Sequence, residues 1–384
     1  MSSPQSSPTP NPSPAPPIWT APPAARPRGG AFAAVGIVLA GIVGLLVVAY
    51  LAPALGVSTL VIGSVLAFVP LMIVLLAVRW VDRWEPEPRW ALWFAFLWGA
   101  AVSVAVALVV DLGVQLVFAF AASGRPGEGM QAVVQAPLVE ESAKGAGVLL
   151  LFAFRRSHFD GPVDGLVYGA TVAAGFAFTE NVLYFGAALA EGGADELGTT
   201  FVVRGLFSPF AHVLFTACTG LAIGIGARRG GRAGVVGWFL GGLLAAVLLH
   251  AFWNGSLVFA SDAVGLYFTV QVPIFIGFIL LTWFLRREEM RVTRTRLAEY
   301  GAAGWFSPTE VEMLASPAGR RQAVAWARRQ TPPRTAAMRK MITDATHLAF
   351  TRHRLLTGRG DVRTAADERA LLAAVTADRA VLLR

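Results

Sequence analysis

The chain has 384 residues, of which 55% are hydrophobic and only 15% are charged, and its mean hydropathy is +0.59. A soluble domain carries about 25% charged residues, so this composition excludes a soluble protein and predicts an all-α, polytopic membrane protein with short soluble parts. The single cysteine, Cys218, excludes an intrachain disulfide framework and a multi-cysteine metal site. A bound metal would therefore need histidine and carboxylate ligands.

The first 30 residues are rich in proline, serine and alanine, which predicts a disordered N-terminus. They do not resemble a cleaved secretory signal, because the segment before the first apolar run is too long and too rich in proline. We interpret that first run as a signal anchor.

Eight apolar runs follow, each long enough to cross a bilayer, for which about 20 residues are needed. They are 31–52, 57–78, 91–120, 131–154, 163–190, 200–227, 233–259 and 264–285. The third run is too long for one straight span and contains Asp111 and Gly113, so we expect it to tilt, break or end early. The membrane domain then covers 31–286.

Arginines gather in every second connection, as the positive-inside rule requires of cytoplasmic loops. The arginine-rich segments are the N-terminus and the connections after the second, fourth, sixth and eighth runs, with Arg26, Arg28, Arg79, Arg83, Arg89, Arg155, Arg156, Arg228, Arg229, Arg232, Arg286 and Arg287. The connection after the fifth run is instead acidic, with Glu191, Asp195 and Glu196. This alternation predicts a plasma-membrane protein with both termini in the cytoplasm.

The C-terminal tail, 287–384, is basic. From Arg286 onward there are 19 lysines and arginines against 10 aspartates and glutamates. The segments 311–328 and 367–383 have helical patterns, but the tail has no strong fold signal. We expect the tail to be attracted to anionic lipid headgroups and not to nucleic acid, because neither interleaved aromatic residues nor a nucleic-acid motif occurs in it.

Charged residues inside the fourth run mark the first candidate for a functional site. Glu140 and Glu141 lie in the sequence Glu-Glu-Ser-Ala-Lys, so Lys144 is three or four positions from each and can pair with either on a helix. A buried ion pair that only joins helices is the structural alternative. Placing a charge at membrane depth costs about 2.5–3.5 kcal/mol on insertion scales, so two adjacent glutamates favour a functional site.

The next three runs each contribute further polar residues. The fifth has Glu180 and Asn181, the sixth has His212, and the seventh has His250 with Asn254 four positions later on the same helix face. Taken singly, Asn181 could join helices and His212 could be a packing residue. Together they predict that four consecutive spans direct polar side chains to one shared interior.

Carboxylates and imidazoles at one site fit three kinds of chemistry. They can hold a catalytic divalent metal, and Glu180, His212 and His250 would be its ligands, with zinc as the expected ion. They can activate water without a metal, or relay protons in a transporter. The paired half-helices of inverted-repeat transporters are not evident in this sequence.

The motifs Glu140-Glu141-x-x-Lys144, Phe176-x-x-x-Glu180-Asn181, His212 and His250-x-x-x-Asn254, in this order on successive spans, resemble the PrsW family of intramembrane proteases. That family is similar to the CAAX-prenyl endopeptidases and to bacteriocin-processing enzymes. In the wider group the motifs are EExxxR, FxxxH and HxxxN. Here Lys144 stands one position closer and Glu180 replaces the histidine, as in the PrsW branch. The resemblance covers about 90–260.

The resemblance implies an intramembrane metalloendopeptidase that makes a site-1-type cut in a membrane-anchored protein such as a single-pass anti-sigma factor. The catalytic residues would be Glu140, Glu141, Glu180, His212, His250 and Asn254, supported by Lys144 and Asn181. Two other functions stay open: a proton-coupled membrane transporter, and a non-catalytic membrane scaffold of the same superfamily.

Overall fold

The computed structural model describes residues 30–121, 127–156, 159, 161–229, 232–360 and 362–383. All regular secondary structure in these residues is helical, and large apolar side chains such as Leu45, Val109 and Leu280 are exposed along the helices. Soluble monomers rarely expose extended apolar surface, so the predicted all-α, polytopic membrane class is confirmed. The predicted disorder of residues 1–30 lies outside the described residues, apart from Gly30, where the first helix begins.

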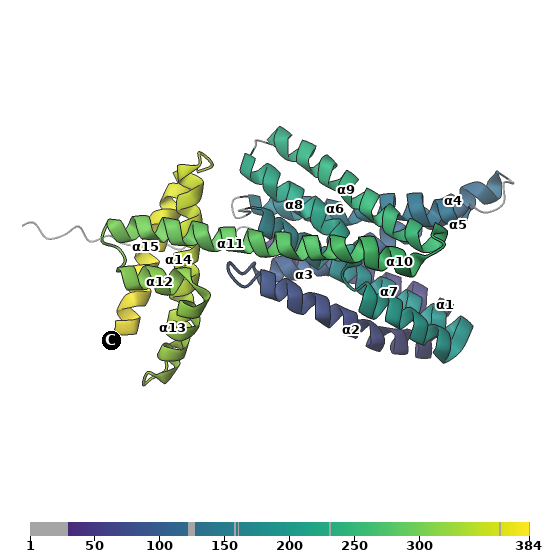
Figure 1. The fold of residues 1–384 in the computed structure, drawn as a ribbon, viewed down its shortest axis with the longest axis horizontal. Coiled ribbons are helices and arrows are strands. Elements are labelled where there is room, and N and C mark those ends of the chain that lie inside the picture. Colours follow the sequence, from purple (N-terminus) through teal and green to yellow (C-terminus); the bar gives the residue numbers. More distant parts are fainter. Residues whose placement is uncertain are drawn as a thin grey trace, which may run out of the picture.

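The membrane part is a bundle of helices that pack along one another (Figure 1). In chain order they are α1 (Gly30–Leu55), α2 (Val57–Val81), α3 (Arg89–Leu97), the π-helical turn η1 (Trp98–Ser103), α4 (Val104–Phe120), α5 (Glu128–Met130), η2 (Gln131–Gln135), α6 (Ala136–Arg155), α7 (Pro162–Phe201), η4 (Val202–Phe207), α8 (Ala211–Arg229), α9 (Arg232–Phe259), α10 (Ala263–Leu266), η5 (Tyr267–Gln271) and α11 (Val272–Ala302).

Six stretches of the described helices are long and apolar enough to cross a membrane. They are Ala34–Leu55, Val57–Val81, Arg89–Phe120, Pro162–Arg229, Gly234–Phe259 and Ala263–Ala302. The sequence predicted eight, and two features account for the difference. The stretch from Pro162 to Arg229 bends into two helices, α7 and α8, and α6 packs inside the bundle although its charged residues make it less apolar. The number of spans stays a prediction.

Helices α7 and α8 pack backbone to backbone through glycines. A Cβ atom on Gly165 would lie 1.9 Å from the carbonyl oxygen of Gly220, so a larger residue would force the two helices apart. One turn further along α7, Gly169 faces Thr216. This close approach places the first turn of α8 against α7, where the rings of Phe176 and His212 are 5.5 Å apart.

The long third run is irregular at a different place from the one expected. The chain stays helical through Asp111 and Gly113, and the irregularity is the π-helical turn η1 between α3 and α4. Trp98 in this turn donates a hydrogen bond from Nε1 to the carbonyl oxygen of Ala143, at 2.9 Å. The turn therefore fixes the third run against α6.

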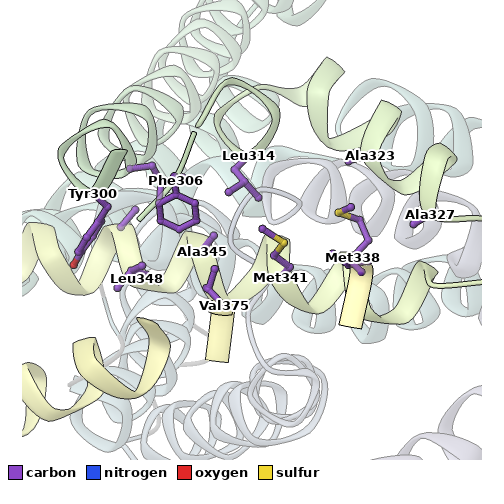
Figure 2. Packing of buried hydrophobic residues seen from close by; sticks show 13 residues of the cluster. Tyr300, Phe306, Leu314, Ala323, Ala327, Met338, Met341, Ala345, Leu348 and Val375 are labelled. Carbon is purple, nitrogen blue, oxygen red and sulfur yellow. The ribbon is translucent and has the colours of Figure 1, made fainter. Parts of the chain in front are cut away.

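The C-terminal tail is a folded group of helices and not only a set of helical patches. The last membrane helix, α11, continues to Ala302, and α12 (Pro308–Ala315), α13 (Pro317–Arg329), α14 (Thr335–Leu356) and α15 (Val362–Leu383) pack around its end (Figure 1). Their shared apolar core, shown in Figure 2, is made of Leu297, Tyr300, Phe306, Leu314, Ala323, Ala327, Met338, Met341, Ala345, Leu348, Ala349, Val375 and Leu382.

Two expectations for the tail were incomplete. The helical pattern over 311–328 is divided, because Ser316 caps a new helix by accepting a hydrogen bond from the amide of Gly319 and Pro317 occupies its first position. Helix α14 was not predicted at all, although Met338, Met341, Ala345, Leu348 and Ala349 recur at helical spacing on its buried face.

The loop between α2 and α3 joins the tail to the membrane bundle. Trp84 in this loop donates a hydrogen bond from Nε1 to Thr293 of α11, at 3.0 Å, and Arg320 of α13 lies over its ring at 3.4 Å. In the same loop, Glu87 accepts hydrogen bonds from Arg155 at the end of α6 and from Tyr168 of α7. The loop thus contacts both the tail and the helix that carries the paired glutamates.

Candidate active site

The centre of the site is a buried ammonium group between two carboxylates on α6. Lys144 Nζ lies 2.7 Å from Glu141 Oε1 and 3.3 Å from Glu140 Oε2, so the lysine pairs with both glutamates. Lys144 and Glu141 are fully buried. The ring of Phe176 lies 3.9 Å from the ammonium and closes one side of it.

Glu141 is held by three donors from three helices. Besides Lys144, Thr216 of α8 donates to Glu141 Oε2 at 2.8 Å, and His250 Nδ1 of α9 lies 3.1 Å from Glu141 Oε1. The ring of Phe215 stacks on the His250 imidazole, with 4.8 Å between centroids. This set of contacts fixes the position of both the carboxylate and the imidazole.

Glu180 and His212 form a second part of the same cluster. His212 Nε2 lies 2.7 Å from Glu180 Oε2, and His212 Nδ1 lies 3.2 Å from Lys144 Nζ. Arg204 of η4 donates from Nη2 to Glu180 Oε2 at 2.5 Å and from Nε to Asn181 Oδ1 at 3.0 Å. The structure therefore brings together Glu140, Glu141, Glu180, His212 and His250, as the sequence predicted.

These partners assign the protons of the two imidazoles. An ammonium only donates, so His212 Nδ1 accepts from Lys144 and His212 Nε2 carries the proton that it donates to Glu180. His250 Nδ1 donates to Glu141, which leaves the lone pair on His250 Nε2. A histidine oriented by a carboxylate in this way is typical of metal ligands and of general bases.

Asn254 lies on the same helix as His250 but is directed elsewhere. Its Nδ2 donates to the carbonyl oxygen of Ala132 in η2, at 2.8 Å. This bond ties α9 to the turn that precedes α6. The catalytic role that the sequence predicted for Asn254 stays a prediction. The Asn181 side chain accepts a hydrogen bond from Arg204.

The cluster lies towards one end of the bundle. Glu140 is in the first turns of α6 and His212 is the second residue of α8, whereas the arginines Arg155, Arg228 and Arg229 are at the opposite ends of the same two helices. The polar site is therefore in the half of the bundle away from the arginine-rich connections.

Comparison with protein families matches residues 87–278 to the PrsW family intramembrane metalloprotease. This match covers half of the chain and contains every candidate site residue. The chain belongs to the PrsW family. The resemblance predicted from the motifs is therefore confirmed, and the matched region ends before the tail.

Individual relatives agree. The chain is similar to the protein named Protease PrsW of Bacillus subtilis (strain 168), with 30% identity over 161 residues, which are 42% of this chain and 66% of that protein. It is also similar to Protease PrsW of Clostridioides difficile (strain 630), with 26% identity over 226 residues, 59% of this chain and 88% of that protein. The alignment thus spans just under two thirds of the Bacillus relative. No solved structure matches the chain.

A PrsW-family metalloprotease implies a metal, and the residues of this chain fit one in donor chemistry. Glu140, Glu141, His212 and His250 each offer a ligand atom, and these atoms lie within 4.8 Å of one another. Two carboxylates and two imidazoles suit a divalent ion such as zinc. The set differs from the predicted ligands because Glu140 and Glu141 take part, while Glu180 is bonded by Arg204 and His212. The Lys144 ammonium bonds both carboxylates and His212 Nδ1, so a metal ion would have to take its place at these three ligands.

Three residues of the site were not among the predicted site residues. Phe176 was part of the motif Phe176-x-x-x-Glu180-Asn181 but was given no role, and Thr216 is at i+4 from His212. Arg204 had no local signal, because it is 24 positions after Glu180. Only the fold brings these two side chains together.

Proposed function

We propose that this chain is an intramembrane endopeptidase that hydrolyses a peptide bond of a membrane-anchored protein. The observation that carries the proposal is the buried cluster of Glu140, Glu141, His212 and His250 on three helices. Burying such groups costs free energy, and a membrane fold keeps them where they perform chemistry. The family and its relatives support a peptidase over a transporter or a scaffold.

The two glutamates differ in their surroundings, which suggests different roles. Glu141 has three donors and is fully buried, so we assign it the role of holding Lys144 and His250 in place. Among the described residues, Glu140 is bonded by Lys144 alone, at the longer distance of 3.3 Å, and its side chain retains some exposure. We propose Glu140 as the general base that takes a proton from the attacking water.

To complete the hydrolysis, Glu140 must then pass this proton to the leaving group. As the water oxygen bonds to the substrate carbonyl carbon, Glu140 receives the proton, and it passes the proton to the leaving amine nitrogen when the C–N bond breaks. The lone pair on His250 Nε2 favours a metal-ligand role for His250 over that of an oxyanion donor. If zinc is bound, Glu141, His212 and His250 would hold it in place of the Lys144 ammonium, with Glu140 left as the base, and the ion would supply Lewis acidity and lower the pKa of its water to about 7.

The position of the cluster supports a cut near the outer face of the membrane. If the arginine-rich connections are cytoplasmic, as proposed with both termini inside, the cluster lies in the extracytoplasmic half of the bundle. A site-1-type cut in a single-pass protein such as an anti-sigma factor fits this depth. Reporter fusions at the N-terminus and at Gly301 should both report cytoplasm.

The basic tail adds a proposed contact with the bilayer. We propose that exposed arginines of α13, among them Arg321, Arg328 and Arg329, are attracted to anionic headgroups on the cytoplasmic surface. Each such charge near the surface contributes about 1 kcal/mol and is screened by salt.

Purified protein in liposomes with co-reconstituted single-pass proteins tests the peptidase assignment. We expect cleavage that stops in Glu140→Gln and is inhibited by a chelator, and elemental analysis that finds about one divalent ion per chain, lost in His250→Ala. Full activity of metal-free protein would contradict the proposed metal and leave the peptidase assignment standing. Absence of cleavage for every single-pass protein tried, with the fold intact by thermal unfolding, would overturn the assignment.

A further inference from the structure

Arg204 reaches the site through a reversal of the chain. On an uninterrupted helix, residues 24 positions apart would be about 36 Å apart, yet Arg204 Nη2 lies 2.5 Å from Glu180 Oε2. The helix α7 is broken at Gly193, which has φ 67° and ψ −152°. Such a conformation strongly favours glycine, so the sequence at this point allows the chain to turn back towards the cluster.

The guanidinium is fixed on three sides. Nη2 binds Glu180, Nε binds Asn181, and the ring of Tyr184 lies 3.8 Å below the Cζ atom. An arginine side chain has five N–H groups. Two of them are used in these bonds, and the hydrogen bonds of the described residues give the remaining N–H groups no acceptor.

Exposure increases from the centre of the cluster towards Arg204. The side chains of Lys144 and Glu141 have no exposed surface, whereas Glu180 is 16% exposed and Arg204 is 23% exposed. Arg204 and Glu180 therefore form the most exposed edge of the cluster. A polypeptide that approaches the cluster over this edge meets the guanidinium first.

From this geometry we propose that Arg204 binds main-chain carbonyl oxygens of the substrate segment beside the scissile bond. A peptide bond can be attacked only where the substrate helix is unwound, and unwound backbone at membrane depth has carbonyl groups that need donors. The free N–H groups of Arg204 supply such donors, and charge-assisted bonds of this kind are the stronger ones. Arg204 is then a substrate-binding residue that also positions Glu180. The inference rests on the proposed peptidase function.

Kinetics on a substrate library test the assignment. Single-span fusion proteins with randomised juxtamembrane segments are reconstituted with the wild-type chain, and cleaved members are identified by mass spectrometry and used for kcat and KM. Arg204→Lys keeps a positive charge beside Glu180 but loses the planar set of donors. We expect its KM to rise about tenfold, the effect of losing one charge-assisted hydrogen bond, with kcat within about twofold. Arg291→Lys, at an exposed position on α11, is the matched control.

A substrate change gives a second measurement that does not depend on the stability of the variant. Replacing the amide next to the cleaved bond by an ester weakens the carbonyl as an acceptor. The ester should raise KM for the wild type and have little effect on Arg204→Lys, so the two changes should not be additive. Additive effects, or a fall in kcat with KM unchanged, would overturn substrate binding by Arg204. A wild-type chain that cleaves no library member would instead overturn the peptidase function, and this inference with it.

Discussion

The membrane bundle and the C-terminal tail place their charges in opposite ways. In the bundle, Lys144 and Glu141 are completely buried between the helices. In the tail, the shared core is apolar, with Leu314 and Leu348 fully buried in it, and ion pairs such as Arg294 with Glu312 lie on the surface.

This contrast distinguishes buried groups that are needed for chemistry from buried groups that stabilise the fold. Removing charges from water costs free energy that a buried ion pair recovers only with good geometry and further hydrogen bonds, and an apolar core of the same volume is often as stable. The tail uses that apolar solution. The bundle keeps an ionic centre that stability alone does not require, and this centre lies inside the region shared with the PrsW family, whereas the tail lies outside it.

The largest expected effect comes from breaking the ionic centre. Glu141→Gln removes the closer of the two carboxylates that pair with Lys144 and the charged acceptor of Thr216 and His250, and breaking a buried ion pair costs about 3–5 kcal/mol. We expect loss of turnover and a marked drop in the unfolding temperature. Lys144→Met should show a similar drop.

Glu140→Gln is the matched control for that prediction. It should also abolish turnover, because the general base is lost, but it should lower the unfolding temperature less, since the bond from Glu140 to Lys144 is longer, at 3.3 Å. Equal stability of Glu140→Gln, Glu141→Gln and Lys144→Met would contradict the division of roles between the two glutamates.

A truncation in the core of the tail should destabilise the tail without stopping turnover. Leu348 is fully buried among the tail helices, and Leu348→Ala should cost about 2–5 kcal/mol through lost contacts and a cavity. We expect limited proteolysis to cut α12–α15 sooner while cleavage of the substrate continues. The exposed Leu356 of the same helix provides the control variant, Leu356→Ala. Loss of turnover in Leu348→Ala would mean that the tail takes part in catalysis.

Breaking the contact between the two regions should have a smaller effect on stability. Arg320 donates to the carbonyl oxygens of Leu314 and Trp84 and to Thr346, so Arg320→Gln removes several bonds to buried acceptors, each worth about 1–3 kcal/mol when left unpaired. Hydrogen exchange should become faster in the 82–88 loop, while the core of the tail stays protected. The exposed neighbour Arg321→Gln should leave exchange in that loop unchanged.

The two regions also differ in how far the sequence predicted them. The ionic centre was predictable because charges at membrane depth are costly, so each glutamate and histidine in an apolar run was informative by itself. Spacing alone did not determine side-chain direction. His250 and Asn254 share a helix face as expected, yet the Asn254 amide binds Ala132 and not the histidine.

Other features depended on the tertiary structure. Arg204 joins Glu180 only because the chain reverses at Gly193. In the tail, the buried face of α14 includes Thr346 and Thr351, so its apolar helical period was weak beside the apolar spans. Membrane composition thus makes functional charges conspicuous and makes an ordinary soluble core hard to recognise.

The smallest expected effect tests the loop at the boundary of the two regions. Burial raises the pKa of Asp82, which follows the last residue of α2, from 3.8 to about 7. The folded protein therefore binds the proton of the Asp82 carboxyl more tightly than the unfolded chain does. The stability that protonation provides is complete below pH 3.8 and is lost as the pH rises through about 7.

Asp82→Asn removes the titration and keeps the oxygen that accepts the amide hydrogen bond of Glu87 at 3.0 Å. At pH 8 the variant should unfold at a temperature higher by on the order of 2 °C, and at pH 4 the difference should vanish. A pH-independent difference between the two proteins, measured at constant ionic strength, would show that Asp82 is not buried as a neutral acid at this boundary.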